Sequence, residues 1–166
     1  MINIFNVDKE KNIKLLILLI ILIEGLGFLS GFLGMASSEV YKELIKPTFS
    51  PPGWVFSIVW TILYFLMAVS LYRIILIGKK GQNVRRGIKY FIIQFVLNFL
   101  WSIIFFRFKL YGLAFIELMI LLIFIILTTF EFYKNDKIAA YLMIPYIIWV
   151  SFAGVLNFSI WMLNEM

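Results

Sequence analysis

The chain has 166 residues, of which 63% are apolar and 14% are charged, and its mean hydropathy is +1.00. Soluble domains contain about 45–50% apolar and about 25% charged residues, so this composition excludes an ordinary water-soluble domain. Cysteine and histidine are absent, which excludes disulfides, thiolate metal sites and imidazole chemistry. The net charge of +6 comes from basic residues between apolar stretches, a pattern typical of membrane proteins rather than of nucleic-acid-binding ones.

Five apolar stretches are long enough to cross a bilayer, which requires about 20 residues at ~1.5 Å each. They are expected at residues 13–37, 52–77, 88–108, 110–132 and 138–163. The sequence therefore predicts an all-α membrane protein, with residues 1–166 forming a single five-helix transmembrane domain in a lipid bilayer. The connection at 107–109 is very short, so the third and fourth spans should form an antiparallel hairpin.

The first span contains an acidic residue and a pair of spaced glycines. A charged carboxylate at the bilayer centre costs on the order of 2.5–3.5 kcal/mol by insertion scales. Glu24 has no partner nearby in the sequence, so it is expected to stay protonated or to pair across the bundle. Gly27 and Gly31 form a GxxxG pair, which lets helices approach closely, either within the bundle or against a second copy.

The connector 38–51 between the first two spans should contain a short helix. Glu39, Lys42, Glu43 and Lys46 recur at three- and four-residue spacing, which favours an amphipathic helix over 38–45. Pro47 should end that helix, because the residue before a proline disfavours helical geometry. The connector is either a plain linker or a lid over one end of the bundle.

Three of the spans carry stripes of polar and aromatic residues at helical spacing. One interpretation is that amides and hydroxyls join helices and that aromatics mark the membrane interface. The other is a flat slot between Trp60 and Trp149, which lie well inside their spans, for a planar apolar ligand that stacks on aromatic rings. The stripes are Ser57, Trp60 and Tyr64; Gln94, Asn98 and Ser102; and Trp149, Ala153 and Asn157.

Two more residues within the spans stand out. Pro145 removes one backbone hydrogen bond from the fifth span and should kink it. Glu117 lies near the membrane end that carries Arg107, and we expect these two residues to pair.

Basic residues divide unequally between the two sides of the predicted bundle. The N-terminal tail and the loops after the second and fourth spans hold 11 Lys and Arg residues, and the other side holds 4. Positive residues favour the cytoplasmic side, so the N-terminus is predicted to be cytoplasmic and the C-terminus outside. A composition rich in Ile and Lys and free of cysteine favours a bacterial plasma membrane.

Three separated motifs resemble one known family. They are KPTFSPPGWVFSIVWTILYFLMAVSLY at Lys46–Tyr72, QFVLNFLWSIIFF at Gln94–Phe106 and PYIIWVSFAGVLN at Pro145–Asn157. In this order they resemble the TspO/MBR family, also called the tryptophan-rich sensory protein / translocator protein or peripheral benzodiazepine receptor family. The resemblance covers the chain from about Tyr41 to Trp161.

The resemblance implies a five-helix membrane fold whose pocket opens toward the first connector. It implies binding of porphyrins such as protoporphyrin IX and haem, and of aromatic ligands of the isoquinoline carboxamide type, with no required cofactor and no metal. Lys42 and Lys46 would lie close enough to the lid to meet porphyrin propionates. The ligand-binding residues implied by motif are Tyr41, Pro51, Trp60, Tyr64, Asn98, Trp101, Leu118, Trp149, Ala153 and Leu156.

Several functions are compatible with this resemblance. The first is a membrane porphyrin-binding protein that acts as a sensor, a sequestering protein or a translocator. The second is an enzyme that degrades porphyrin in light, in which Trp60 and Trp149 would be redox-active. The third is a transporter or channel, suggested by the two carboxylates inside the membrane.

The resemblance also implies partners. Family members are usually homodimers, and the glycine face of the first span is a candidate interface because the third span is bulky. Nucleic acid is not an expected partner. Cholesterol is not expected either, because Met162 follows Trp161 where animal members carry a basic residue.

Overall fold

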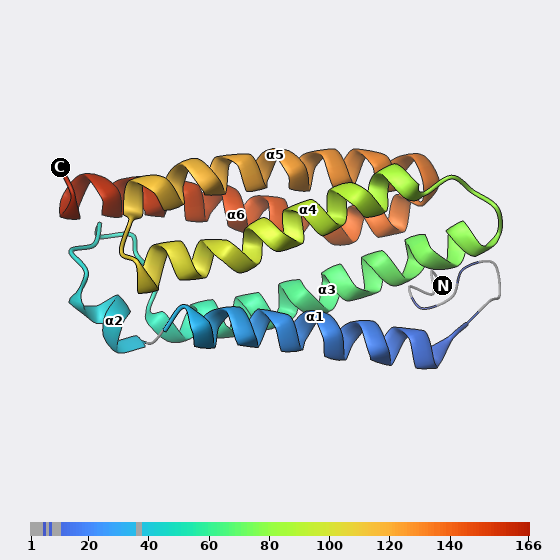
Figure 1. Ribbon diagram of the computed structural model, residues 1–166, viewed down its shortest axis with the longest axis horizontal. Coiled ribbons are helices and arrows are strands. Elements are labelled where there is room, and N and C mark those ends of the chain that lie inside the picture. Colours follow the sequence, from blue (N-terminus) through green and yellow to red (C-terminus); the bar gives the residue numbers. More distant parts are fainter. Residues whose placement is uncertain (1–4, 6, 8–10, 36–37) are drawn as a thin grey trace.

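The computed structural model describes residues 5, 7, 11–35 and 38–166, and within these residues it confirms an all-α fold with five helices that are long and apolar enough to cross a membrane. Figure 1 shows these helices side by side along one long axis. The elements are α1 Ile13–Leu33, α2 Ser38–Glu43, α3 Gly53–Lys79, α4 Arg85–Ser102, the short π-helix η1 Ile103–Arg107, α5 Tyr111–Asn135 and α6 Lys137–Asn164.

Two predicted boundaries lie too far along the chain. Helix α1 ends at Leu33 rather than at residue 37, because Gly34 and then Met35, which has a φ of 55°, turn the backbone out of the helix. Helix α2 ends at Glu43 rather than at residue 45. There the Lys46 ammonium donates to the backbone carbonyls of the last turn, a common way to satisfy carbonyls at a helix C-terminus.

The helices pack as neighbours along most of their length. Helix α5 packs against both α4 and α6, and α3 packs against both α1 and α6. The start of α1 lies at the same end as the α3–α4 and α5–α6 connections, while α2 and the last turn of α6 lie at the opposite end (Figure 1). We call these the basic end and the lid end. Helix α6 runs through Pro145 as one helix, so the proline does not break it.

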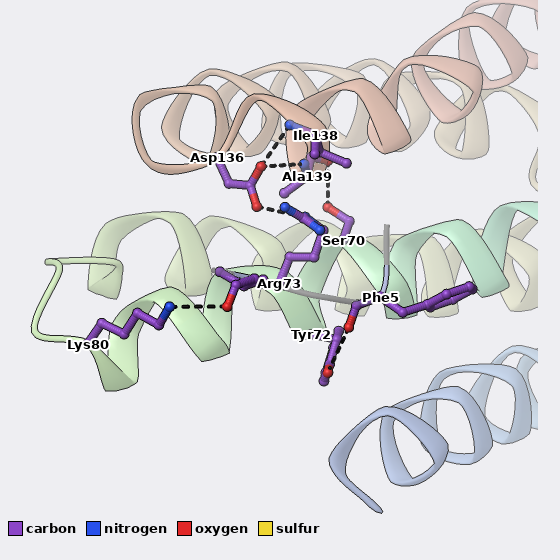
Figure 2. A network of polar contacts seen from close by, with 9 residues as sticks. Phe5, Ser70, Tyr72, Arg73, Lys80, Asp136, Ile138 and Ala139 are labelled. Atoms are coloured by element: carbon purple, nitrogen blue, oxygen red, sulfur yellow. Dashed lines mark hydrogen bonds and ion pairs between the residues drawn. The ribbon is translucent and has the colours of Figure 1, made fainter. Parts of the chain in front are cut away.

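A buried ion pair joins α3 to the start of α6 at the basic end (Figure 2). Arg73 Nε lies 2.7 Å from Asp136 Oδ2, and both side chains are buried. The other carboxylate oxygen of Asp136 caps α6 by accepting from the backbone amides of Ile138 and Ala139. Ser70 Oγ donates to the carbonyl of Ala139 at 2.8 Å. Arg73, both oxygens of Asp136 and the Ser70 hydroxyl therefore have hydrogen-bond partners. A buried charge pair is tolerated when its polar atoms are satisfied in this way.

Phe5, Val7 and Asn12, which precede α1, are also tied to the end of α3 at the basic end. The Tyr72 hydroxyl donates to the carbonyl of Phe5 at 3.2 Å and accepts from the Asn12 amide. Lys80 Nζ donates to the carbonyl of Val7 at 3.1 Å (Figure 2). The Asn12 side chain then caps α1 by accepting from Leu15 N. This end of the bundle is therefore closed by polar bonds as well as by packing.

The connector 38–51 is fastened to α6 at the lid end. Asn164 Oδ1 accepts from the backbone amide of Ile45, and Asn164 Nδ2 donates to the carbonyl of the same residue. Next to this pair, the Glu165 carboxylate caps α5 by accepting from the amides of Tyr111 and Gly112. The connector is thus an ordered lid rather than a plain linker.

Candidate ligand-binding cavity

A cavity of about 950 Å³ lies among the lid-end halves of α1, α3 and α4, with α2 at one end. Its volume is at the upper end of the roughly 300–1,000 Å³ typical of small-molecule sites. Aromatic rings dominate its walls. The lining residues are Glu24, Gly25, Gly27, Phe28, Ser30, Gly31, Phe32, Tyr41, Gly53, Trp54, Phe56, Ser57, Trp60, Thr61, Tyr64, Asn98, Trp101, Ser102 and Phe106.

The deep part of the cavity contains a buried polar pair. The Tyr64 hydroxyl donates to Asn98 Oδ1 at 2.8 Å, and this hydrogen bond is buried. Trp60 stacks on the Tyr64 ring with centroids 5.4 Å apart, and its edge meets Tyr146. A methyl group at Gly27 would overlap the Tyr64 ring, so the glycine is what lets α1 lie against this tyrosine. Three helices therefore fix the position of the Tyr64–Asn98 pair.

The cavity is open on one side toward the surface that faces lipid. Phe28 and Phe32 on α1 are 77% and 71% exposed, and Trp54 on α3 is 65% exposed, yet all three line the cavity. Ser57 and Thr61, on the same face of α3, are exposed as well. A hydrophobic molecule dissolved in the bilayer can therefore reach the cavity sideways, between the lid-end halves of α1 and α3.

Tyr41 on α2 closes the cavity at the lid end. Its hydroxyl donates to the carbonyl of Pro51 at 3.2 Å, and its ring meets Phe56 edge to face at 5.1 Å. Burial raises the pKa of Tyr41 above its ordinary value, and the nearby Ser50 hydroxyl opposes that shift. Pro51 itself contributes this carbonyl rather than a wall of the cavity.

The Lys46 side chain makes its hydrogen bonds within the lid. Its ammonium donates to the carbonyls of Tyr41, Lys42 and Leu44 at 2.6, 3.2 and 3.1 Å and lies 4.8 Å from the centre of the Tyr41 ring. These contacts use all three of its donor hydrogens, so Lys46 is not placed to bind a propionate as the sequence suggested. Lys42 is exposed on α2 and does not line the cavity.

Ala153 and Leu156 lie on the other side of Trp101, around a separate void of about 20 Å³. Tyr41, Phe56, Trp101 and Phe106 line both spaces. The indole N–H of Trp101 donates to Asn157 Oδ1 at 3.1 Å, which fixes the ring between them. This small void has room for little more than a methyl group, so α6 borders the site without opening into the large cavity.

Trp149 and Leu118 lie outside both spaces. Trp149 packs against Phe56 with ring centroids 5.6 Å apart and against Phe152 at 5.5 Å, while Leu118 is buried in the core. Trp60 lines the large cavity and Trp149 does not, so the two indoles do not face each other across it. Helices α3 and α6 pack directly against each other there, and the open space lies on the opposite side of α3, toward α1.

The two membrane carboxylates have different surroundings. The expected pair between Glu117 and Arg107 is wrong, because the Arg107 guanidinium instead donates to the carbonyl of Leu33 at 3.3 Å. Glu117 is buried, and neither of its oxygens has a hydrogen-bond partner within the described part of the chain. Glu24, by contrast, lines the cavity.

The glycine face of α1 points into the chain's own bundle. Gly27 meets Tyr64, and Gly34 meets the backbone and side chain of Ser102. Gly31 has nothing close to it and lines the cavity. Gly27 and Gly34 therefore serve contacts within one chain.

Five of the residues predicted to bind ligand line the large cavity, namely Tyr41, Trp60, Tyr64, Asn98 and Trp101. It did not predict the wall formed by α1. The signal was present, because Glu24, Gly27, Phe28 and Gly31 recur at three- and four-residue spacing and so share one helical face. The uniformly apolar character of that span concealed it, since lipid-facing and cavity-facing residues there are chemically alike.

Comparison with known proteins assigns the chain to a family. Residues 18–162 match the TspO/MBR family. The chain is 40% identical over 156 residues to the tryptophan-rich protein TspO of Chlorobaculum tepidum, covering 93% of this chain and 99% of that protein. It is 37% identical to the Archaeoglobus fulgidus protein of the same name, covering 92% and 99%. It is also 31% identical to the human translocator protein, covering 75% of each.

The match extends through all five spanning helices, because it begins inside α1 and ends inside α6. The three motifs that resemble the family lie within this match, in the segments that form much of α3, α4 and α6. This chain is an integral membrane protein that belongs to the TspO/MBR family.

Proposed function

We propose that the chain binds planar tetrapyrroles such as protoporphyrin IX or haem, and other aromatic ligands, in the cavity among α1, α3 and α4. The observation that carries this proposal is the cavity itself, with about 950 Å³ of space and a lining that includes Trp54, Trp60, Tyr64 and Trp101. Each stacked or edge-on aromatic contact contributes roughly 0.5–1.5 kcal/mol beyond the area that it buries.

The residues of the cavity suit a tetrapyrrole held by its ring rather than by its metal. The chain has no His or Cys, so the lining offers neither of the strong axial ligands to haem iron that these residues supply. The hydroxyls of Tyr41 and Tyr64 are engaged with Pro51 and Asn98. Metal-free and metal-containing porphyrins should therefore bind with similar affinity.

The opening toward lipid suggests how such a ligand would be handled. A porphyrin can enter from the bilayer past Phe28 and Trp54 and come to rest under the lid at Tyr41. Relatives are named sensory and translocator proteins, and occupancy of a site under a lid suits either role. With the N-terminus on the cytoplasmic side, the lid would face outward.

The test is a titration of protoporphyrin IX into protein purified in detergent, followed by quenching of tryptophan fluorescence. Trp60→Ala should weaken binding at least about tenfold, since it removes an aromatic ring from the cavity wall and the stacking contact of that ring with Tyr64. Trp161→Phe is the matched control, because Trp161 packs on Phe115 and Phe158 outside the cavity. Equal affinity in both variants and the parent protein would rule out this site.

A further inference from the structure

Glu24 is the acidic residue that lines the cavity, and it lies at the deep end of that space. It is nine residues from the lid end of α1, a distance of about 13 Å at 1.5 Å per residue. Tyr64 on α3 and Asn98 on α4 lie at comparable depths in their helices and line the same space. The three side chains together form a polar floor under an aromatic chamber.

The carboxylate of Glu24 has no positive partner. The lining contains neither Lys nor Arg, and within the residues that the structure describes Glu24 makes no ion pair or hydrogen bond. The neighbouring Tyr64 hydroxyl donates to Asn98 instead. A carboxylate inside a membrane is costly and ordinarily has a functional partner, and here the space in front of it is open.

The rings around Glu24 favour a positive charge as well. Phe28, Trp60 and Tyr64 line the same cavity as Glu24, and the faces of aromatic rings attract cations. A carboxylate attracts a cation strongly where water is excluded. An anion placed on this floor would meet both the carboxylate and the negative faces of the rings.

We propose that the cavity also accepts lipophilic organic cations, with Glu24 as the residue that selects for positive charge. The ligand class is a bulky apolar molecule with a single positive centre, able to enter from the bilayer and small enough for about 950 Å³. Glu24 binds the charge at the floor, and the aromatic walls enclose the apolar groups.

The proposed cation site lies in the same cavity as the proposed tetrapyrrole site. The Glu24 charge therefore also influences which edge of a bound porphyrin points inward. Porphyrin propionates are anionic, so Glu24 turns them away from the floor and toward the lid end. The apolar edge of the porphyrin, rather than the edge that carries the propionates, then lies over Tyr64. The two ligand classes use the same walls, but only the cation depends on the Glu24 charge for its affinity.

The experiment compares tetraphenylphosphonium with tetraphenylborate, which have nearly the same shape and opposite charge. Each is titrated into protein in detergent at about pH 8, with tryptophan fluorescence as the readout and protein-free micelles as the blank. We expect the phosphonium ion to bind and to compete with protoporphyrin IX. Glu24→Gln should weaken phosphonium binding at least about tenfold and should leave or improve borate binding. Glu24→Asp should retain most of the preference.

Glu43→Gln is the matched control, because it removes the same charge from an exposed position on the lid helix, and it should change phosphonium affinity less than about twofold. A Tm equal to that of the parent protein shows that Glu24→Gln is folded, and retained protoporphyrin binding shows that its cavity is intact. Equal phosphonium affinity in Glu24→Gln and the parent, or equal binding of the two ions by the parent, overturns the proposal. Failure of protoporphyrin alone overturns the tetrapyrrole function and leaves the cation site standing.

Discussion

The two halves of α3 have opposite surroundings. From Met67 to Ile77 nearly every residue is buried, including Ser70 and Arg73. From Trp54 to Ile62 one face of the helix is exposed or lines the cavity. Both halves are mostly apolar, yet one half lies in the core of the bundle and the other forms a wall of the cavity.

This difference shows how a five-helix bundle can be both stable and open. At the basic end, α3 is enclosed by α1, α6, Phe5 and Val7, and the Arg73–Asp136 pair joins α3 to α6. At the lid end, residues of α1, α3 and α4 line the cavity. Stability should therefore depend on the basic end and ligand affinity on the lid end, and the following predictions test that division.

Asp136→Ala should have the largest effect on stability. It leaves Arg73 buried without its carboxylate and removes the cap of α6. Breaking a buried pair in this way costs about 3–5 kcal/mol. Thermal unfolding in detergent, followed by circular dichroism, should show a much lower Tm.

The matched control for that variant is Glu131→Ala, which breaks the more exposed pair with Lys134 at 2.6 Å. Pairs of that kind contribute about 0–1 kcal/mol. A Tm for Asp136→Ala equal to that of Glu131→Ala would mean that the basic end does not carry the stability. The double variant Arg73→Met with Asp136→Leu should recover part of the loss, since it removes the buried Arg73 charge together with its Asp136 partner.

Gly27→Ala and Gly31→Ala should separate packing from open space on the same face of α1. A methyl group at residue 27 overlaps the Tyr64 ring, whereas one at residue 31 meets nothing within 4 Å. Overpacking of this kind costs about 1–3 kcal/mol, and displacement of Tyr64 should also lower protoporphyrin affinity several-fold. Gly31→Ala should change the Tm little. If the two variants behave alike in unfolding and in titration, α1 does not pack on Tyr64 as described.

Asn164→Ala should loosen the lid without unfolding the bundle. It removes both hydrogen bonds that join α6 to the backbone of Ile45, each of which contributes about 0.5–1.5 kcal/mol. Hydrogen exchange at the Ile45 amide should become faster, and bound protoporphyrin should dissociate faster, while the Tm changes by only a few degrees. Unchanged exchange at Ile45 would show that the lid is held by other contacts.

High pH should have the smallest of these effects, and its effect on the lid should depend on Tyr41. Burial raises the pKa of Tyr41 in the folded protein, so its phenol contributes stability that is complete below the unfolded-state value of about 10. That contribution is lost as pH rises through the folded-state pKa. The protection factors of the amides in residues 40–46, which compare exchange with its intrinsic base-catalysed rate, should fall at alkaline pH, and Tyr41→Phe should remove this pH dependence. A fall in protection that persists in Tyr41→Phe would assign it to another group.

The sequence predicted the spans well because each one meets the length and hydropathy that a bilayer requires, and it predicted the Trp60, Tyr64 and Asn98 stripes from helical spacing. It could not predict on which side of α3 the space would open. That depends on how closely α6 packs against Phe56, a tertiary property. It also missed the Arg73–Asp136 pair, because those residues lie far apart in the sequence and each is close to the end of a predicted span, where charges are ordinary.

The sideways opening of the cavity has a consequence for every affinity measured on this protein. A hydrophobic ligand accumulates in the bilayer, so the concentration that Phe28 and Trp54 encounter is set by the partition of the ligand between lipid and water. The membrane then acts as a reservoir, and a modest intrinsic affinity is enough to fill the site. Apparent dissociation constants should therefore scale with the amount of lipid in the sample, and meaningful values are those expressed per unit of lipid.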